Sequence, residues 1–179
     1  MSDFIWVEKY RPTTIDECIL PKSIKKTFQD FVDRGEIPNM LLSGPPGIGK
    51  TTVAKALCNQ LGADYYVING SDEGRFLDTV RTNAKNFAST VSLTSESKHK
   101  VIIIDEADNT TSDVQFLLRA SIEEFSKNCR FIFTCNYKNK IIDPLHSRCS
   151  VVDFSVNKKD KPTIAAQFFA RLNSILEEE

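Results

Sequence analysis

The feature that most restricts the fold of this chain is the segment GPPGIGKT at residues 44–51. It follows a short apolar run at residues 40–42, precedes a helical stretch at residues 50–61, and fits the pattern G-x-x-x-x-G-K-[ST]. Glycines at this spacing let backbone N–H groups wrap an anion at a helix N-terminus. Lys50 can then reach the β- and γ-phosphates of a nucleotide, and the Thr51 hydroxyl can coordinate Mg²⁺. The alternative is a glycine-rich turn without a ligand, and the strand–loop–helix context argues against it.

The rest of the chain repeats this alternation of apolar runs and helical stretches, which predicts parallel βαβ units. Further strands are predicted at residues 65–68, 101–104, 131–134 and 151–154, and further helices at residues 23–34, 76–91 and 112–126. Gly35 is expected to end the first of these helices, and Ser112 to begin the last through a capping box with Gln115. Apolar runs without polar alternation favour strands that helices cover on both faces. We therefore predict an α/β fold in which helices flank a five-stranded parallel sheet.

The last stretch, residues 160–178, has apolar side chains on one broad helical face. Such a face needs a partner, and the chain supplies none after it. We expect residues 1–156 to form a nucleotide-binding domain and residues 157–179 to begin a second, helical domain that the chain does not contain in full. Docking of this face onto a neighbouring chain is the alternative.

The composition excludes several classes of protein. With 41% hydrophobic and 26% charged residues, a disordered or fibrous chain is not expected. The 23 basic and 24 acidic residues exclude a globally basic nucleic-acid binder, although a local basic face stays open. The apolar runs are too short to cross a bilayer, and no secretion leader is recognisable. The five cysteines form no C-x-x-C pair, which favours reduced, mostly buried thiols in a cytosolic protein.

Two acids, Asp105 and Glu106, directly follow the apolar run at residues 101–104. A carboxylate at the carboxyl end of a central strand, beside a phosphate loop, is placed to serve Mg²⁺, and we expect this role for Asp105. Glu106 would point toward the γ-phosphate, where it could orient and deprotonate the attacking water. Acids just past a strand are often only turn residues, but the phosphate loop upstream favours the functional interpretation.

Two further polar residues accompany the later strands, and residue type alone does not decide their roles. Asn136, after the run at residues 131–134, could hydrogen-bond the γ-phosphate or the attacking water, but an asparagine there more often caps a turn. Arg148, just before the fifth strand, could stabilise phosphoryl charge in a neighbouring molecule, because its guanidinium is planar and always charged. Most surface arginines have no such role.

These motifs, in this order, resemble those of the AAA+ ATPases. Residues 44–51 match Walker A, IDEAD at residues 104–108 matches Walker B, and Asn136 falls at the sensor 1 position. WVEKYRP at residues 6–12 and SRC at residues 147–149 are similar to segments of clamp-loader subunits. Over nearly its whole length, the sequence is similar to the ATPase subunits of sliding-clamp loaders, of the T-even-phage large-subunit and replication factor C small-subunit types.

The resemblance implies a role for each matching residue, with ATP and Mg²⁺ as cofactors. The adenine pocket would be shaped by Val7, Glu8, Lys9, Tyr10 and Ile19. The phosphates would be held by Gly47, Ile48, Gly49, Lys50, Thr51 and Thr52. Catalysis would involve Lys50 on the phosphates, Thr51 and Asp105 at Mg²⁺, Glu106 on the water, Asn136 as γ-phosphate sensor, and Arg148 as a finger on the next subunit's ATP.

The resemblance also implies a function: an ATPase subunit that opens a sliding clamp and loads it on primer–template DNA during replication. Its partners would be the other subunits of a hetero-pentamer, the clamp and the DNA. Binding to a membrane is not expected. It would work in the cytoplasm, that of the host if viral, or in the nucleus if eukaryotic. Residues 157–179 would begin the family's helical lid domain. Because an arginine finger works only across an interface, the chain alone should hydrolyse ATP weakly.

Contacts with DNA and the clamp are less explicit. Four residues on or beside one predicted helix and in the loop before the next could contact DNA phosphates: Arg75, Arg81, Lys85 and Thr110. A solvated helix face explains them equally well. Ile122 and Phe125 could offer an apolar contact to the clamp or belong to the core.

Other functions stay open. An ATP-binding scaffold subunit without turnover would need only Arg148, and the presence of both Lys50 and Glu106 argues against it. Another AAA+ DNA remodeller, such as a branch-migration helicase, would not explain the segments at residues 6–12 and 147–149 together. A small-molecule kinase fits worst, since adjacent acids and a finger arginine suit hydrolysis in an assembly.

Overall fold

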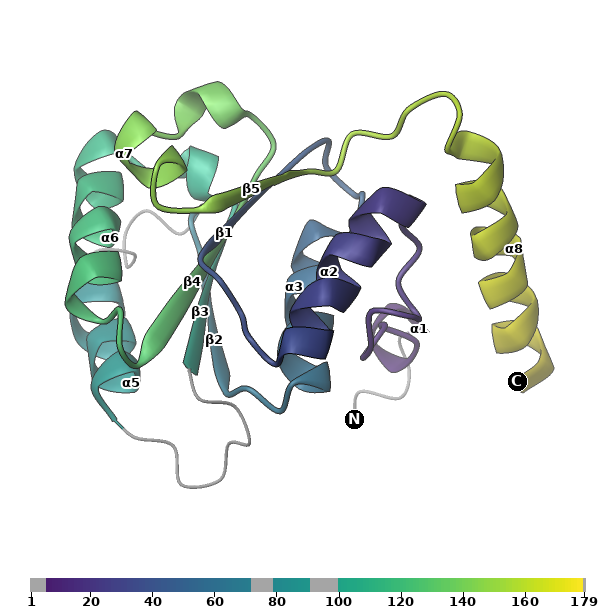
Figure 1. Cartoon of the computed structure of the whole chain (residues 1–179), viewed down its shortest axis with the longest axis horizontal. Helices are drawn as coiled ribbons and strands as arrows, with labels where there is room; N and C mark the ends of the chain where they lie inside the picture. Colours follow the sequence, from purple (N-terminus) through teal and green to yellow (C-terminus); the bar gives the residue numbers. More distant parts are fainter. Residues whose placement is uncertain (1–5, 72–78, 91–99, 179) are drawn as a thin grey trace.

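Five parallel strands form the centre of the computed structural model, which describes residues 6–71, 79–90 and 100–178 (Figure 1). The strands are β1 (Met40–Ser43), β2 (Tyr65–Asn69), β3 (Lys100–Asp105), β4 (Cys129–Cys135) and β5 (Ser150–Asp153). They pair in the order β2-β3-β4-β1-β5, and every pairing is parallel. The predicted α/β fold with a five-stranded parallel sheet is confirmed.

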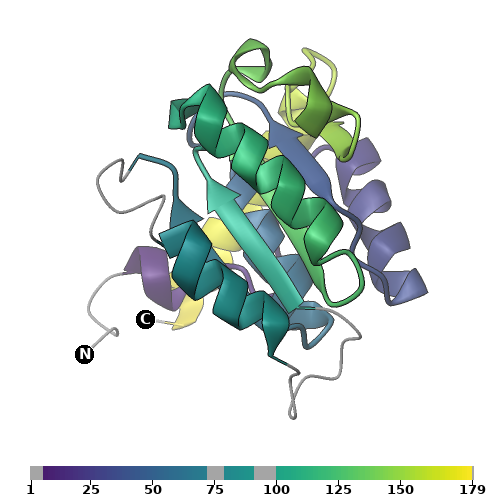
Figure 2. The same cartoon turned by 90° about the vertical axis from the view of Figure 1, so that its left-hand side faces the viewer.

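Helices lie on both sides of the sheet. The longer ones are α2 (Lys22–Arg34), α3 (Lys50–Gln60), α6 (Ser112–Glu124) and α8 (Lys161–Glu178), and the shorter ones are α1 (Trp6–Lys9), α5 (Lys85–Ser89) and α7 (Asp143–His146). The π-helical turn η1 (Thr79–Ala84) precedes α5, and the 3₁₀ turns η2 (Ala107–Asn109) and η3 (Lys138–Lys140) follow β3 and β4. Helices α2 and α3 cover one face, and α5 and α6 cover the other (Figures 1 and 2). None of the described helices is both long and apolar enough to cross a membrane.

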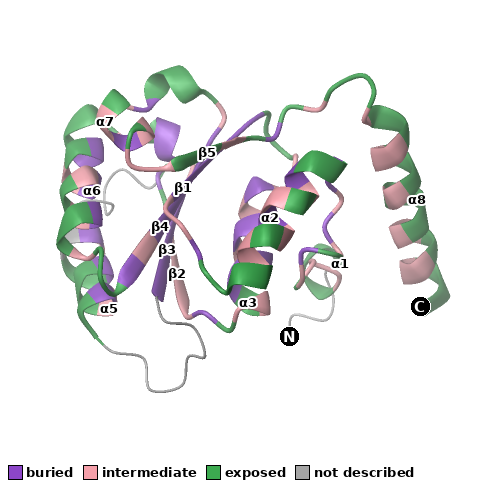
Figure 3. Cartoon of the chain, in the orientation of Figure 1, coloured by how far each residue is buried: buried purple, intermediate pink, exposed green. Residues whose placement is uncertain are grey.

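The central strands are apolar without interruption because their alternate side chains serve two separate cores. Met40 and Leu42 of β1 belong to the core beneath α2 and α3. Leu41, between them, belongs to the core beneath α5 and α6. Ile103 and Ile102 of β3 divide in the same way between the two cores. Burial on both faces therefore explains the absence of polar alternation in these strands (Figure 3).

The helix predicted at residues 76–91 differs from the structure in type and length. Residues 76–78 and Val91 lie outside the described residues. The segment between them is the π turn η1 followed by α5, which ends at Ser89. Val80 and Ala84 are buried, so the apolar spacing identified the correct face. A four-residue spacing does not distinguish a wider π turn from an α-helix, because both place side chains four residues apart on nearly the same side.

The predicted capping box at Ser112 is wrong by one residue. The N-cap of α6 is Thr111, whose side chain accepts the N–H of Val114 at 3.5 Å. The side chain of Gln115 does not bond to the N-cap residue. It is buried, and its Oε1 accepts the N–H of Ile142 at 2.8 Å. The side chain that suggested a cap therefore fastens α6 to the segment before α7.

Two other predictions concern the ends of elements. Gly35 ends α2 as expected, because it takes a left-handed φ of +64° and its N–H bonds to the carbonyl of Val32 at 3.0 Å. The expectation that helices cover every strand on both faces is wrong for β5, where Val151 is 43% exposed. Among the described residues, this strand lies at the edge of the sheet and pairs with β1 alone.

Helix α8 stands apart from the sheet, and none of its residues is buried (Figure 3). Phe168, Phe169 and Leu176 are each more than half exposed. Its attachment is polar, since the side-chain amide of Gln167 bonds to both the N–H and the C=O of Leu20, each at 3.2 Å. The apolar face of α8 is thus largely uncovered by the described part of the chain. A second domain beginning at residue 157 stays a prediction.

All five cysteines are free, and four of them are buried, as the sequence suggested. Desolvation by burial raises the pKa of the Cys18 and Cys135 thiols to about 11. The same cause raises the pKa of Cys58, Cys129 and Cys149 to about 12. The thiols are therefore protonated at neutral pH.

Replacement of Phe28 tests the core beneath α2. Phe28 is fully buried, and its ring centroid lies 6.0 Å from those of Phe31 and Phe154. We expect Phe28→Ala to lower the free energy of unfolding by about 3–5 kcal/mol, measured by denaturant titration. The matched control is Phe169→Ala, since Phe169 is 60% exposed and should change stability by only about 0.5 kcal/mol. Equal losses for the two variants would contradict this assignment.

Candidate functional site

The glycine-rich loop joins β1 to α3, as its motif requires. Gly47 and Gly49 have φ values of +74° and +93°, which residues with a Cβ rarely adopt. The loop curls round Lys50, whose Nζ donates to the carbonyl oxygens of Gly44 and Pro45, both at 2.8 Å. Lys50 is 7% exposed, and desolvation lowers the pKa of its ammonium group. The loop thus holds a buried positive charge that a phosphate would compensate.

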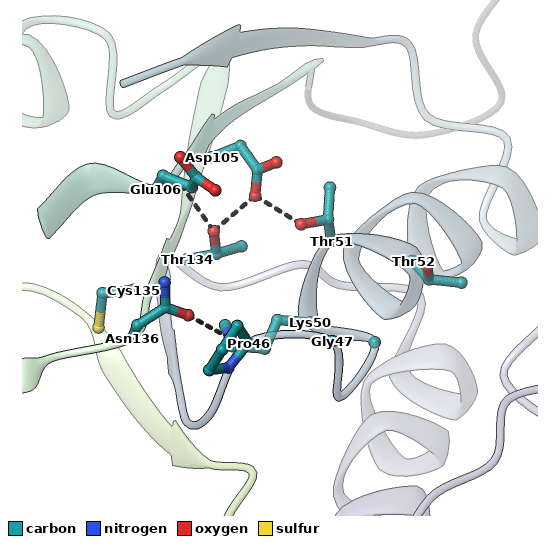
Figure 4. Close-up of a pocket in the computed structure, with 11 residues that line it drawn as sticks. Pro46, Gly47, Lys50, Thr51, Thr52, Asp105, Glu106, Thr134, Cys135 and Asn136 are labelled. Atoms are coloured by element: carbon teal, nitrogen blue, oxygen red, sulfur yellow. Dashed lines mark hydrogen bonds between the residues drawn. The ribbon is translucent and has the colours of Figure 1, made fainter. Parts of the chain in front are cut away.

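Asp105, at the end of β3, is the centre of a hydrogen-bonded group with two threonines (Figure 4). Its Oδ1 accepts from the hydroxyl of Thr51 at 2.5 Å and from that of Thr134 at 2.6 Å. Hydroxyl and carboxylate oxygens are ligands that Mg²⁺ prefers, so Thr51 and Asp105 fit the expected metal site. Within the described residues, no cluster of three His, Cys, Asp or Glu forms a metal site. A magnesium ion here would therefore depend on phosphate oxygens as well.

Glu106 has an unusual backbone conformation. Its φ of +54° is the one positive value at a non-glycine residue in the described ranges, and it costs about 1–2 kcal/mol. Its N–H donates to Oγ1 of Thr134 at 3.0 Å. Its carboxylate accepts from the hydroxyl of Ser71 and from Nδ2 of Asn109, the latter at 3.1 Å. Strain of this kind is concentrated at functional sites, which supports a chemical role for the residue.

Asn136 follows β4 and faces the phosphate loop. Its Oδ1 accepts from Nζ of Lys50 at 3.0 Å. Its backbone N–H and that of Tyr137 both donate to Oδ2 of Asp108, each at 3.0 Å. Asp108 is 6% exposed and therefore supports the turn from inside. The turn is thus capped by Asp108, whereas the side chain of Asn136 is directed at the lysine.

The polar side chains that the sequence singled out line one cavity of about 270 Å³ at the carboxyl edge of the sheet (Figure 4). They come from α3, from β3 and the residue after it, and from the end of β4: Lys50, Thr51, Asp105, Glu106 and Asn136. Thr134 lines the same cavity and was not expected from the sequence. The fold therefore brings a cation, two acids and an amide together beside a helix N-terminus.

A second cavity of about 370 Å³ adjoins the first along the glycine-rich loop, and the two share Gly47, Gly49 and Thr52. Its other wall residues are mostly apolar and include Ile19, Leu20, Ile48, Val53, Phe154, Ile164 and Phe168. A polar cavity beside an apolar one matches a nucleotide, with phosphates in the first and a base in the second.

Of the five residues predicted to shape the adenine pocket, Ile19 lines the apolar cavity, and its contact with a base stays a prediction. The residues Val7, Glu8, Lys9 and Tyr10 are absent from the walls of the apolar cavity. Val7 is 73% exposed, because α1 turns its side chain outward. Ile164 and Phe168 of α8 line the cavity instead. The sequence marked them only as part of an apolar helix face, which does not indicate what that face contacts.

Arg148 lies outside the walls of both cavities. Its Nε and Nη2 donate to Oε1 of Glu123 on α6, at 2.9 and 2.5 Å, and its Nη1 donates to the carbonyl of Pro144 at 3.0 Å. The hydrogen bond from Arg148 is the main cause of the lowered pKa of Glu123. The guanidinium is therefore held at the surface, where it can meet another molecule and not a nucleotide bound in these cavities.

The candidate DNA contacts are only partly described. Arg75 lies outside the described residues, as does the side chain of Arg81. Lys85 is exposed and forms an ion pair with Glu124 at 3.1 Å. The hydroxyl of Thr110 donates to the carbonyl of Ala107 at 2.6 Å. A role at DNA stays a prediction for all four residues.

The proposed apolar contact with a clamp is not offered by Ile122, which is 5% exposed and belongs to the core beneath α6. Phe125 is half-buried and packs against the same core. The alternative that these are core residues is therefore correct for Ile122. On α6 the large hydrophobic side chain that reaches solvent is Phe116, which is 50% exposed.

Residues 40–156 match the sequence model of the family described as "ATPase family associated with various cellular activities (AAA)". The chain is 46% identical over 158 residues to the replication factor C small subunit of Methanocella arvoryzae, a match that covers 86% of this chain and 48% of that protein. It is 44% identical over 181 residues to the sliding-clamp-loader large subunit of Enterobacteria phage T4, covering 99% of this chain and 56% of that protein. The chain thus spans about half the length of these curated relatives.

Solved structures agree on the fold. The RuvB Holliday junction branch migration motor of Thermotoga maritima superposes with a TM-score of 0.66, covering 92% of this chain and 55% of that chain. The two sequences are 22% identical, so this likeness concerns the fold alone.

Replacement of Gly70 tests how closely β2 approaches the two acids. A Cβ there would lie 2.5 Å from the carbonyl oxygen of Glu106 and 3.1 Å from that of Asp105. We expect Gly70→Ala to lower the free energy of unfolding by about 1–3 kcal/mol and to weaken Mg²⁺-dependent nucleotide binding, measured by calorimetry.

The control is Gly35→Ala, which strains a left-handed φ at a position with no atom within 4 Å of the new Cβ. It should destabilise the chain by about 1–2 kcal/mol and leave nucleotide binding unchanged. Equal nucleotide binding by the two variants would contradict the close packing around the acids.

Proposed function

We propose that this chain, which belongs to the AAA family of ATPases, binds and hydrolyses ATP as a subunit of a sliding-clamp loader. The observation that carries the proposal is the polar cavity in which Lys50, Asp105, Glu106 and Asn136 converge beside the N-terminus of α3. A helix N-terminus and a buried lysine attract phosphates, and adjacent carboxylates serve a metal and a water molecule. The relatives named as clamp-loader subunits indicate the process that this chemistry drives.

The residues of the cavity divide the work of hydrolysis. Lys50 would exchange the carbonyl oxygens of Gly44 and Pro45 for β- and γ-phosphate oxygens. Thr51 and Asp105 would hold Mg²⁺, which neutralises the charge that develops on the phosphates. Glu106 would accept the proton of the attacking water. Asn136 would contact the γ-phosphate, a role supported by the distance of 3.0 Å between its Oδ1 and Nζ of Lys50.

The apolar cavity would take the adenine base. Ile19 and Ile48 line it, and Gly47, Gly49 and Thr52 lie where it meets the phosphate site. A role for Val7, Glu8, Lys9 and Tyr10 would need α1 to move toward this cavity.

Arg148 would act on the ATP of a neighbouring subunit. Its guanidinium is held at the surface by Glu123, and Arg148 is not among the wall residues of either cavity. A positive charge delivered across an interface stabilises the transferring phosphoryl group and makes turnover depend on assembly. The chain alone should therefore hydrolyse ATP slowly.

The proposed partners follow from the relatives. They are the other subunits of a hetero-pentameric clamp loader, the sliding clamp and primer–template DNA, with Arg75, Arg81, Lys85 and Thr110 as candidate DNA contacts. Five free thiols fit a reducing compartment, the cytoplasm or the nucleus. A scaffold role without turnover is disfavoured, because Lys50 and Glu106 line the same cavity.

Steady-state ATPase activity of the assembled complex, with and without clamp and primer–template DNA, tests this proposal. We expect strong stimulation by clamp and DNA, and a loss of about 10³-fold or more in Arg148→Ala, because the finger charge is removed. The control is Arg34→Ala, which removes an exposed arginine at the end of α2. Turnover that ignores clamp and DNA would exclude the clamp-loader function, and full activity of Arg148→Ala would exclude the finger.

A further inference from the structure

Thr134 joins the two acids of the site through one buried hydroxyl. It is the next-to-last residue of β4, is 1% exposed and lies opposite Leu42 of β1. Its Oγ1 is 2.6 Å from Oδ1 of Asp105 and 3.0 Å from the backbone nitrogen of Glu106 (Figure 4). The neighbouring acids therefore share one hydrogen-bonding partner.

The direction of both hydrogen bonds follows from the chemistry of the groups. A backbone N–H can only donate, so the hydroxyl oxygen of Thr134 accepts from Glu106. The hydroxyl group then donates its single hydrogen bond to Asp105, because an ionised carboxylate is only an acceptor. Oδ1 of Asp105 thus accepts two hydrogen bonds, one from the hydroxyl of Thr134 and one from that of Thr51. Because the hydroxyl of Thr51 donates this hydrogen bond, the lone pairs of its oxygen stay available to a metal.

The same hydroxyl fixes the peptide unit between the two acids. The carbonyl of Asp105 accepts the N–H of Gly70 at 2.7 Å, and the N–H of Glu106 is held by Thr134. Glu106 has a φ of +54°, which is unfavourable for a residue with a Cβ, so this peptide needs support at both ends. Without the Thr134 hydroxyl, the N–H of Glu106 would lose the hydrogen-bond acceptor that the structure gives it.

We propose that Thr134 is the positioning residue that aligns Asp105 for Mg²⁺ and Glu106 for the attacking water. The inference rests on the proposed ATP hydrolysis and names a residue that acts through the two acids. Its hydroxyl is occupied by both of them, so it does not need to touch the nucleotide. Partners of this kind typically contribute about 10–100-fold to metal affinity or activity.

The test compares Thr134→Val, which keeps the shape of the side chain without the hydroxyl, with Thr134→Ser, which keeps the hydroxyl. Two quantities are measured on the assembled complex: the Mg²⁺ concentration for half-maximal binding of a fluorescent ATP analogue, and the single-turnover rate of ATP hydrolysis. We expect Thr134→Val to raise the first and lower the second by about 10-fold or more each. Binding of the analogue in EDTA should not change, and Thr134→Ser should restore both quantities.

The matched control is Ser43→Ala in the neighbouring strand. Ser43 is 2% exposed, and its hydroxyl has no hydrogen-bond partner within the described part of the chain. Its loss should leave Mg²⁺ dependence and hydrolysis unchanged. Thr134→Ala, which also lacks the hydroxyl, replaces Thr134→Val if the latter does not fold.

The possible outcomes separate the inference from the proposed function. If the wild-type complex neither binds nor hydrolyses ATP, both are overturned. If the wild type is active and the variants without the hydroxyl keep its Mg²⁺ dependence and rate, only the role of Thr134 is overturned. A loss in Thr134→Ser as large as that in Thr134→Val would mean that packing, and not the hydroxyl, matters at this position.

Discussion

The place of β4 between β3 and β1 is the constraint on which the rest of the structure depends. Parallel strands end at the same edge of a sheet, so this order brings together the loop after β1, the acids after β3 and the amide after β4. Where β1 and β4 end side by side, Lys50 contacts Asn136. Where β3 and β4 end side by side, Asp105 contacts Thr134. Were β4 at an edge of the sheet, it would neighbour only one of β3 and β1, and one of these two contacts would be lost. Two apolar cores, one on each face, hold it in the centre.

Three polar residues of the site, Lys50, Thr134 and Asp108, are buried, yet they have partners within the chain. Lys50 bonds to loop carbonyls, Thr134 to both acids, and Asp108 to two backbone N–H groups. A buried polar group without a hydrogen bond costs about 1–3 kcal/mol, so these contacts let the sheet edge keep its shape without phosphate. Nucleotide binding would then exchange hydrogen bonds at a formed site. A lysine whose pKa is lowered by burial also gains from an anion that stabilises its charged form.

The sequence was most informative where one residue type is chemically required. The glycines, Lys50 and Thr51 of the loop and the acids Asp105 and Glu106 could be predicted, because phosphate and magnesium restrict which residues can serve them. Thr134 could not, since a threonine inside an apolar strand is equally typical of ordinary β-structure. Helix type, the N-cap of α6 and the orientation of α1 were also missed, because they depend on tertiary contacts. The outward position of Val7 and the π turn before α5 show this most clearly.

The burial of the cysteines bears on how the chain can be handled chemically. Maleimides and iodoacetamides react with thiolates, and every native thiol here has a pKa of about 11 or 12. At neutral pH the folded chain therefore presents very little thiolate to such reagents. A single cysteine introduced on the exposed face of α6 or α8 would be labelled in preference to all five. The chain can carry a fluorophore or a spin label without prior replacement of its native cysteines.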